Sequence, residues 1–213
     1  AYRMKHNDAI VIIANGQFPS AAHCMDILEK ATLLICCDKA ADNLLAYGKD
    51  PDIIIGDLDS ISEDTKNQFS DIFIASYDQD NNDLTKAVNY CIEQGYQSVT
   101  ILGATGLREY HTLGNISLLL EYNKMIKARM ISDHGEFSIL LHGESISSYP
   151  GEHISFFSID NNIRVTSEGL KYRLRNIQLH NWWRASLNEV EGDNFTLHFE
   201  SEWPLILYRV IQP

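Results

Sequence analysis

Short apolar runs that alternate with amphipathic stretches are the feature that most constrains the fold of this 213-residue chain. Five such runs lie in the first two thirds of the sequence: "AIVIIANG", "LLICCD", "DIIIGD", "DIFIAS" and "SVTILGA". Each run is long enough for one β-strand, and its apolar residues are too continuous for a sheet with one solvated face. Such runs are typical of strands covered on both faces. The first part of the chain therefore predicts an α/β fold, an open and mostly parallel sheet flanked by helices.

One intervening segment, "LTKAVNYCIEQG", has the spacing of an amphipathic helix. Five apolar residues recur at helical intervals: Leu84, Ala87, Val88, Cys91 and Ile92. Gly95 follows them, where a left-handed C-cap fits. The segment predicts a helix that ends at Gly95.

The texture of the sequence changes after about residue 135. Apolar runs are now separated by Gly, Asn and Asp turns: "EFSILLHG", "HISFFSI", "IRVTSEG", "FTLHFES" and "PLILYRV". These runs predict antiparallel strands. We expect an α/β domain over residues 1–135 and a C-terminal antiparallel β-sandwich domain over residues 136–213. Pro150 and Gly151, in "SSYPGEH", punctuate the chain near this boundary.

Composition narrows the possible partners and the compartment. A formal net charge of -12 argues against a nucleic-acid or anionic-membrane surface, because both require clustered Lys and Arg. The four cysteines show no C-x-x-C pair or zinc-like spacing, which favours a reduced compartment. The start has no apolar signal core, and no eighteen apolar residues run together. We expect a cytoplasmic protein that binds neither nucleic acid nor membrane.

Two carboxylates, Asp57 and Asp59, directly follow the apolar run "IIIG". On an extended backbone, side chains two residues apart project to the same side, so these like charges would lie side by side. Such a pair raises one of its own pKa values or attracts a cation. A polar turn is the alternative, since Ser60 and Glu63 have capping-box spacing. The box does not account for the carboxylates, so we favour a metal site.

A second acidic segment, "YDQDNND", follows the next apolar run. In open parallel sheets, ligands bind beyond the carboxyl ends of the strands, where Asp38 also lies. A third carboxylate from Asp80 or Asp83 would complete an oxygen set suited to Mg²⁺ carrying phosphates. The alternative is that Asn82 or Asp83 simply caps the following helix.

The segment "GATGLREYHTLGN" follows the fifth run and precedes an apolar helix. Gly103 and Gly106 let backbone N–H groups approach an anion, although the segment contains neither G-K-[ST] nor G-x-G-x-x-G. Arg108, His111 and Asn115 can share one helix face. We expect Arg108 to bind phosphate, whereas a single His or Asn can also be structural.

Four aromatic residues stand out in the β domain: Tyr172, Trp182, Trp183 and Trp203. Large aromatic side chains bury much apolar area, so we expect these in the core or at a dimer contact.

In order along the chain, four segments together resemble the thiamine pyrophosphokinase family: "CDKAADNLLAYGKDPDIIIGDLDS", "DQDNNDLTKA", "GATGLREYHTLGN" and "SEGLKYRL". The resemblance covers nearly the whole length and includes a C-terminal segment similar to "SLNEVEGDNFTLHFESEWPLILYR". It implies an enzyme that transfers a pyrophosphoryl group from ATP to the hydroxyl of thiamine, with Mg²⁺, releasing AMP and thiamine diphosphate.

The resemblance also implies roles for individual residues. It assigns catalysis to Asp57, Asp59, Asp83 and Arg108, the three carboxylates being the metal ligands. It assigns the nucleotide site to Asp38, Asp80, Lys86, His111 and Asn115. It assigns thiamine binding to Tyr172, Ser186 and Asn188. Family members are similar in being homodimers whose thiamine pocket forms between the catalytic domain and the β domain of the partner.

Three positions depart from the family pattern. Lys39 replaces a glycine, Tyr110 stands where an Asp precedes the His, and Leu187 replaces a small hydroxyl residue before Asn188. They keep open the alternative of a non-catalytic protein that binds ATP or thiamine. The carboxylates themselves leave two further alternatives, a pyrophosphokinase acting on another alcohol such as a hydroxymethylpterin and a hydrolase with an aspartyl nucleophile.

Overall fold

The computed structural model describes residues 9–57 and 59–212 of the chain. The chain forms two compact units that meet between Asp133 and His134, two residues before the expected boundary. Pro150 and Gly151 do not mark this boundary. They form a turn inside the second unit, between strand β8 (Ser145–Ser147) and strand β9 (His153–Phe157).

The first unit contains a six-stranded parallel sheet in the order β6-β5-β1-β2-β3-β4. Its strands are β1 (Ile10–Ile13), β2 (Leu33–Cys37), β3 (Ile53–Gly56), β4 (Phe73–Ala75), β5 (Ser98–Leu102) and β6 (Lys127–Ile131). Each of the five apolar runs forms one of these strands, as predicted. The sequence pattern missed β6, because exposed Lys127 and Arg129 alternate with its buried residues.

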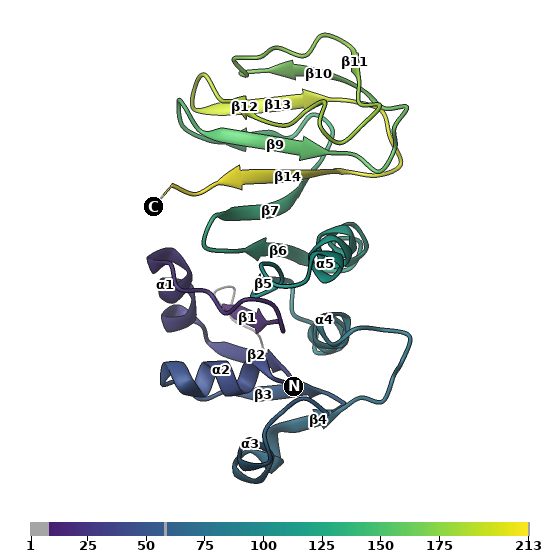
Figure 1. Cartoon of the computed structure of the whole chain (residues 1–213). Coiled ribbons are helices and arrows are strands. Elements are labelled where there is room, and N and C mark those ends of the chain that lie inside the picture. The colour runs from purple at the N-terminus through teal and green to yellow at the C-terminus, as the bar shows by residue number, and fades with distance from the viewer. Residues whose placement is uncertain (1–8, 58, 213) are drawn as a thin grey trace. The chain divides into compact units, whose positions relative to one another are not determined.

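The helices of this unit are α1 (Ala22–Lys30), α2 (Ala40–Tyr47), α3 (Glu63–Gln68), the 3₁₀ turn η1 (Ser70–Ile72), α4 (Asp83–Glu93) and α5 (Glu109–Tyr122). Figure 1 shows α1 and α2 on one face and α4 and α5 on the other. The predicted helix is α4, and Gly95 beyond it has φ 78°, the left-handed conformation expected there. Within the described ranges, no helix combines the length and the apolar character needed to cross a bilayer.

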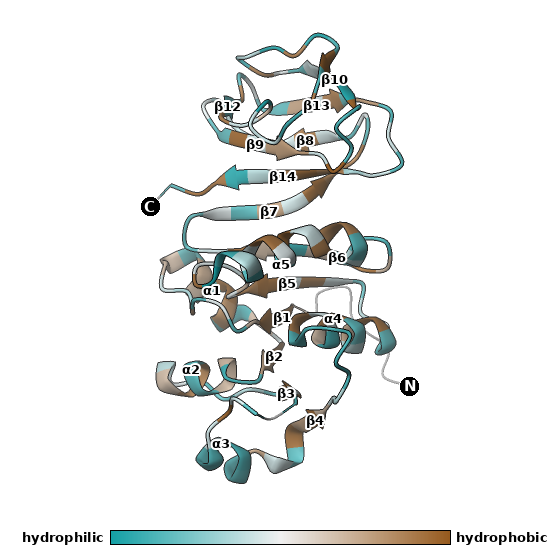
Figure 2. Cartoon of the chain, turned by 45° about the vertical axis from the view of Figure 1, so that its right-hand side comes forward, coloured by the Kyte–Doolittle hydropathy of each residue, from teal (hydrophilic) through white to brown (hydrophobic). Residues whose placement is uncertain are grey.

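Burial of the central strands explains why their sequences are so continuous. The side chains of Ile12, Ile13, Ile35, Ile54 and Ile101 have no more than traces of exposed surface. In Figure 2 the central strands β1 and β5 are brown, whereas α3 is largely teal. Full burial of one isoleucine side chain stabilises the folded state by roughly 1.5–3 kcal/mol relative to leaving it exposed. The sheet is thereby a rigid support for the loops that follow its strands.

The second unit consists of two antiparallel sheets. One has the order β12-β9-β14-β7 and the other the order β11-β10-β13-β8. The remaining strands are β7 (Gly135–Leu140), β10 (Arg164–Glu168), β11 (Ile177–Gln178), β12 (Asn188–Glu189), β13 (Asn194–His198) and β14 (Leu205–Val210). Phe156 of the first sheet and Phe195 of the second belong to one buried cluster, so the unit is the expected β-sandwich.

Candidate functional site

A cavity of about 600 Å³ lies beyond the carboxyl ends of the parallel strands. The sheet order reverses at β1, whose neighbours are β2 on one side and β5 on the other. Open parallel sheets bind ligands at such a switch point. The lining comes from the loops after β1, β2, β3, β4 and β5, which contribute Asn15, Lys39, Asp57, Asp78 and Thr105 among others. Five strand ends therefore converge on one site.

Close backbone packing joins the loops after β1 and β5. The N–H of Gly16 donates to the Gly103 carbonyl at 2.6 Å, and the N–H of Gln17 donates to the Thr105 carbonyl at 2.8 Å. A Cβ atom at residue 16 would lie 2.3 Å from the Gly103 oxygen, so only glycine fits there. Gly103 itself has φ 68°, which also favours glycine. Main-chain contacts thus fix one wall of the cavity.

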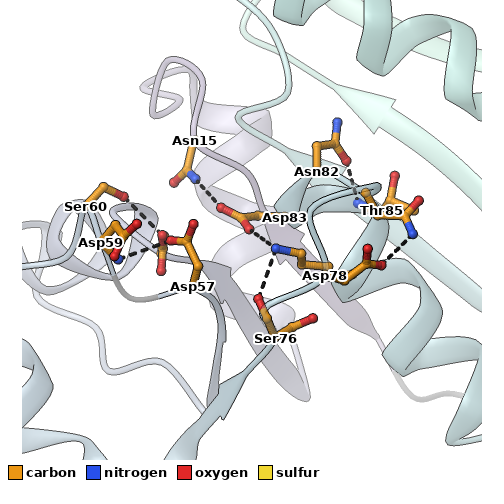
Figure 3. A network of polar contacts seen from close by, with 12 residues as sticks. Asn15, Asp57, Asp59, Ser60, Ser76, Asp78, Asn82, Asp83 and Thr85 are labelled. Atoms are coloured by element: carbon orange, nitrogen blue, oxygen red, sulfur yellow. Dashed lines mark hydrogen bonds and ion pairs between the residues drawn. The ribbon is translucent and has the colours of Figure 1, made fainter.

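Two of the predicted metal ligands, Asp57 and Asp83, line this cavity. Figure 3 shows Asp83 between two donors, and Asp57 lies on the neighbouring loop. The Asn15 amide donates to Asp83 Oδ2 at 3.4 Å, and Lys86 Nζ donates to Asp83 Oδ1 at 3.2 Å. Asn82 caps α4, because its side chain accepts the N–H of Thr85 at 2.8 Å. Asp83 is therefore not the cap of α4, and its carboxylate lines the cavity with one bond to each oxygen.

Asp59 lies differently from Asp57. Strand β3 ends at Gly56, before both aspartates. Asp59 is exposed and does not line the cavity. Its backbone N–H donates to Asp57 Oδ1 at 3.1 Å. In the structure Asp59 thus holds the Asp57 carboxylate, with its own side chain outside the cavity.

The predicted capping box of Ser60 and Glu63 is wrong. Helix α3 begins at Glu63, and its N-cap is Ser62, whose hydroxyl accepts the N–H of Thr65 at 3.3 Å. Ser60 instead donates its hydroxyl to Asp38 Oδ2 at 3.1 Å. Ser60 and Ser62 are both residues that can cap a helix. The helix begins at Glu63, so Ser62 is the N-cap.

Asp38 is buried, with 2% of its surface exposed, and it is not among the residues that line the cavity. It packs against Gly56, where a Cβ atom would lie only 2.2 Å from Asp38 Oδ1. Asp38 also has φ 41°, a left-handed conformation that Asp tolerates better than most residues. The structure therefore places Asp38 beneath the loop that carries Asp57.

In the loop after β4, Asp78 rather than Asp80 lines the cavity. The Asn81 amide donates to Asp78 Oδ2 at 2.7 Å, and the Asp80 N–H donates to Asp78 Oδ1 at 2.9 Å. The pKa of Asp78 is lowered, first by the hydrogen bond from the Asn81 side chain and then by the one from the Asp80 backbone. Asp80 is exposed. Sequence reasoning grouped Asp78 with this segment without assigning it a role.

Lys86 is the most buried cation of the site, with 7% of its side chain exposed. Besides Asp83, it donates to the Ser76 carbonyl at 3.1 Å. Lys86 therefore ties α4 to the end of β4, and its charge is offset by Asp83.

Arg108, His111 and Asn115 all line the cavity. Arg108 is the N-cap residue of α5. Asn115 is buried, and its amide donates to the Ala104 carbonyl at 2.8 Å while its oxygen accepts the Asn82 amide at 3.2 Å. Asn115 thus joins α5 to the loop after β5 and to the start of α4.

Asn15 belongs to the site, although sequence reasoning missed it. Its side-chain oxygen accepts the N–H of Ala40 at 3.1 Å, and its amide contacts Asp83. Its position just after the first predicted strand could have indicated this, because candidate residues followed each of the other predicted strands.

In the second unit, two of the three predicted substrate residues, Tyr172 and Asn188, contact each other. Asn188 is buried, accepts the Tyr172 N–H at 3.2 Å and donates to the Tyr172 carbonyl at 2.9 Å. The Ser186 hydroxyl donates to the Trp183 carbonyl at 2.8 Å. The core expectation is wrong for Tyr172, Trp182 and Trp183, which are 58%, 59% and 73% exposed. Trp203 is half-buried.

The carboxylates that line the cavity fit a metal ion that takes only some of its ligands from the protein. Among residues 9–57 and 59–212, no three His, Cys, Asp or Glu side chains are grouped closely enough to hold a metal ion by themselves. Mg²⁺ is commonly bound by one or two carboxylates together with water and substrate phosphates. Asp57 and Asp83 line one cavity and match this partial set.

Comparison with protein families gives two matches that lie in succession. Residues 24–130 match the catalytic domain of thiamin pyrophosphokinase. Residues 135–207 match the substrate-binding domain of thiamin pyrophosphokinase. The two matches correspond to the two structural units.

Whole-chain comparisons agree. Thiamine pyrophosphokinase of Bacillus subtilis is 30% identical over 178 residues, covering 80% of this chain and 83% of the relative. Thiamine pyrophosphokinase 1 of Oryza sativa is 28% identical over 92% of this chain and 86% of the relative. The crystal structure of the Bacillus subtilis protein has a TM-score of 0.79 at 28% identity, over 97% of this chain and 100% of that one. Thiamin pyrophosphokinase from Candida albicans shares the fold, with a TM-score of 0.80 at 20% identity over 96% of this chain and 90% of that one. This chain belongs to the thiamine pyrophosphokinase family.

Proposed function

We propose that this protein transfers a pyrophosphoryl group from ATP to the hydroxyl oxygen of thiamine, so that thiamine diphosphate and AMP leave. The observation that carries the proposal is the cavity at the switch point, where Asp57, Asp83 and Arg108 come together from separate loops. Membership of the family supplies the substrates. No observation favours a pterin or another alcohol as the acceptor.

Mg²⁺ is the proposed cofactor, held by Asp57 and Asp83, with Asp59 as the third carboxylate that the resemblance implies. When bound, the ion would neutralise charge on the triphosphate. The protein's own task is to keep the carboxylates in place. The Asp59 N–H, the Asn15 amide and Lys86 do so through the contacts described above.

Arg108 is the proposed phosphate ligand that stabilises the transferred group. Pyrophosphoryl transfer needs little covalent help from a protein, so catalysis depends on positioning and on stabilising charge. The guanidinium presents donors in a planar fork that matches phosphate oxygens. His111 lines the same wall, while Lys86, Asp38 and Asp80 act on the carboxylate loops in this proposal.

Thiamine is proposed to contact Tyr172, Ser186 and Asn188. The thiazolium ring of thiamine is a permanent cation, which an exposed aromatic face such as Tyr172 attracts. The net charge of -12 also suits a cationic substrate. We propose a homodimer, as the resemblance implies, and the exposed Trp182 and Trp183 are suitable contact residues. The cytoplasmic location stays a prediction from the reduced cysteines.

The test is an assay of the purified protein with ATP and Mg²⁺, with and without thiamine, read by mass spectrometry. We expect AMP and thiamine diphosphate in equal amounts, and only with thiamine. Asp57→Asn and Asp83→Asn should each lower the rate about 100-fold or more, as the loss of a charge-stabilising group does. The matched control is Asp26→Asn on α1, whose exposed carboxylate pairs only with Lys30 among the described contacts.

Other products would contradict the proposal. Free phosphate formed without an acceptor would identify a hydrolase. A pterin product would identify a different acceptor. Thermal stabilisation by ATP or thiamine without AMP would identify a binding protein.

A further inference from the structure

Arg108 has a neutral partner at the edge of the cavity. Its Nη1 donates to the hydroxyl oxygen of Tyr110 at 3.0 Å. Tyr110 is 63% exposed and does not itself line the cavity, whereas Arg108 does. The tyrosine hydroxyl is therefore placed to act on the guanidinium rather than on a ligand in the cavity.

The Tyr110 ring is held by its neighbour. The centroids of the Tyr110 and His111 rings lie 4.3 Å apart, with 34° between their planes. His111 sits in the first turn of α5 and lines the cavity. The helix thereby fixes the ring, and the ring fixes the position of the hydroxyl.

Lys86 also lines the cavity, but its partner differs from that of Arg108. Lys86 pairs with the Asp83 carboxylate, which offsets its charge. In the described part of the chain, no carboxylate pairs with Arg108, so the hydroxyl orients the guanidinium without neutralising it. A guanidinium has five N–H donors, and the bond to Tyr110 uses one of them. The remaining donors and the full charge are available for phosphate.

We propose that Tyr110 is a positioning residue that holds the Arg108 guanidinium towards the phosphates, with His111 as the support of its ring. This inference rests on the proposed function for its phosphate ligand. It gives a role to the position where the family pattern has an aspartate and this chain has tyrosine.

The first test is Tyr110→Phe, which removes only the hydroxyl from an exposed side chain. With thiamine and ATP as substrates, we expect kcat to fall about 3- to 10-fold while the KM for thiamine stays unchanged. The reason is that Arg108, the proposed ligand of the transferred phosphates, loses its hydrogen bond to Tyr110. The matched control is Tyr47→Phe, which removes an exposed hydroxyl bonded to Glu29 and leaves the cavity untouched. A purely structural loss would not discriminate between kcat and this KM.

The second test is a double-mutant cycle with Arg108→Met. If Tyr110 acts through Arg108, Tyr110→Phe has no further effect once the guanidinium is absent. An equal loss in both backgrounds would overturn the proposal. So would a Tyr110→Phe enzyme that matches the unmutated enzyme in kcat.

The third test is calorimetric binding of inorganic pyrophosphate with Mg²⁺, which needs no turnover. We expect Tyr110→Phe to weaken binding about 3- to 10-fold in the Arg108 background and not at all in the Arg108→Met background. Equal affinities for Tyr110→Phe and the unmutated protein would overturn the inference. A protein that binds pyrophosphate in this pattern but makes no thiamine diphosphate would overturn the proposed function alone.

Discussion

Asp42 on α2 accepts two hydrogen bonds from Ser62, the N-cap residue of α3. The Ser62 hydroxyl lies 2.8 Å from Asp42 Oδ1, and the Ser62 N–H lies 3.1 Å from Asp42 Oδ2. The Thr65 hydroxyl adds a third bond, at 2.5 Å from Asp42 Oδ1. The loop that carries Asp57 thus starts at the rigid strand β3 and ends at a helix anchored to α2.

Loss of this anchor should destabilise the first unit and loosen the loop. We expect Asp42→Ala to lower the free energy of unfolding by about 1–3 kcal/mol, because the buried Thr65 hydroxyl and the exposed Ser62 lose their acceptor. The rate of thiamine diphosphate formation should fall in parallel. Urea unfolding checks this prediction, with Asp26→Ala as the control at an exposed ion pair. An Asp42→Ala protein with the unfolding midpoint of the control would contradict it.

The same carboxylate predicts a pH dependence. Partial burial alone would raise the pKa of Asp42, but hydrogen bonds from Thr65 and Ser62 outweigh it and lower the pKa. A lowered pKa in the folded state gives stability that is present above the ordinary value of 3.8 and is lost as the pH falls through the folded pKa. The stability advantage over Asp42→Asn should therefore be constant near neutral pH and shrink below 3.8. Chemical unfolding at several acidic pH values measures the difference, and an advantage that grows on acidification would refute the prediction.

Gly56 should not tolerate a methyl group. Because a Cβ atom there would lie 2.2 Å from Asp38 Oδ1, Gly56→Ala must displace the buried aspartate and its bond to Ser60. We expect a loss of about 1–3 kcal/mol in the free energy of unfolding. Gly114→Ala is the matched control, since a Cβ atom on that helical glycine meets nothing within 4 Å. The control should be stabilised by up to about 1 kcal/mol. Equal unfolding midpoints for the two variants would show that Asp38 moves without cost.

Asn188 should matter through Tyr172. Its two bonds to the Tyr172 backbone are lost in Asn188→Ala, and we expect about 1–3 kcal/mol of destabilisation. If Tyr172 contacts thiamine, the KM for thiamine should rise while the KM for ATP stays constant. Steady-state kinetics separates the two constants, with the exposed Asn162→Ala as the control. A rise confined to the KM for ATP would count against the assignment.

The four cysteines should be unreactive in the folded protein. Cys24, Cys36, Cys37 and Cys91 have no exposed surface. Burial raises the pKa of Cys91 to about 12, and burial followed by the charge of Asp133 raises the pKa of Cys24 to about 12. Only the thiolate form of a cysteine attacks a disulfide reagent such as dithiobis-nitrobenzoate, and this attack releases thionitrobenzoate. We therefore expect no thionitrobenzoate at neutral pH until guanidinium unfolds the chain. Fast labelling of one thiol in the native protein would disprove this prediction.

Much of the fold could be predicted because buried parallel strands leave a continuous apolar signal. All five runs form strands, and α4 ends where Gly95 permits a left-handed residue. Strand β6 escaped, since its buried and exposed residues alternate as they do in a one-sided strand. Pro150 and Gly151 were misleading because a turn between strands uses the same residues as a linker.

The candidate site was predictable to the extent that strand ends meet at one edge of a parallel sheet. This rule brought Asp57, Asp83 and Arg108 together without any knowledge of distances. It could not tell which carboxylate of each loop turns inwards. Asp57 rather than Asp59 lines the cavity, and so does Asp78 rather than Asp80.

The sequence by itself determined the fold class, the two-unit division, the family and the loops that line the cavity, because all of these depend on local pattern and order. Only the tertiary structure decided the partners of each polar group. Asn15 bonds to Asp83, Ser60 bonds to Asp38, and Arg108 bonds to Tyr110, and no local pattern records these contacts. The physical reason is that a hydrogen bond depends on distance and direction between atoms, which are set when distant segments pack.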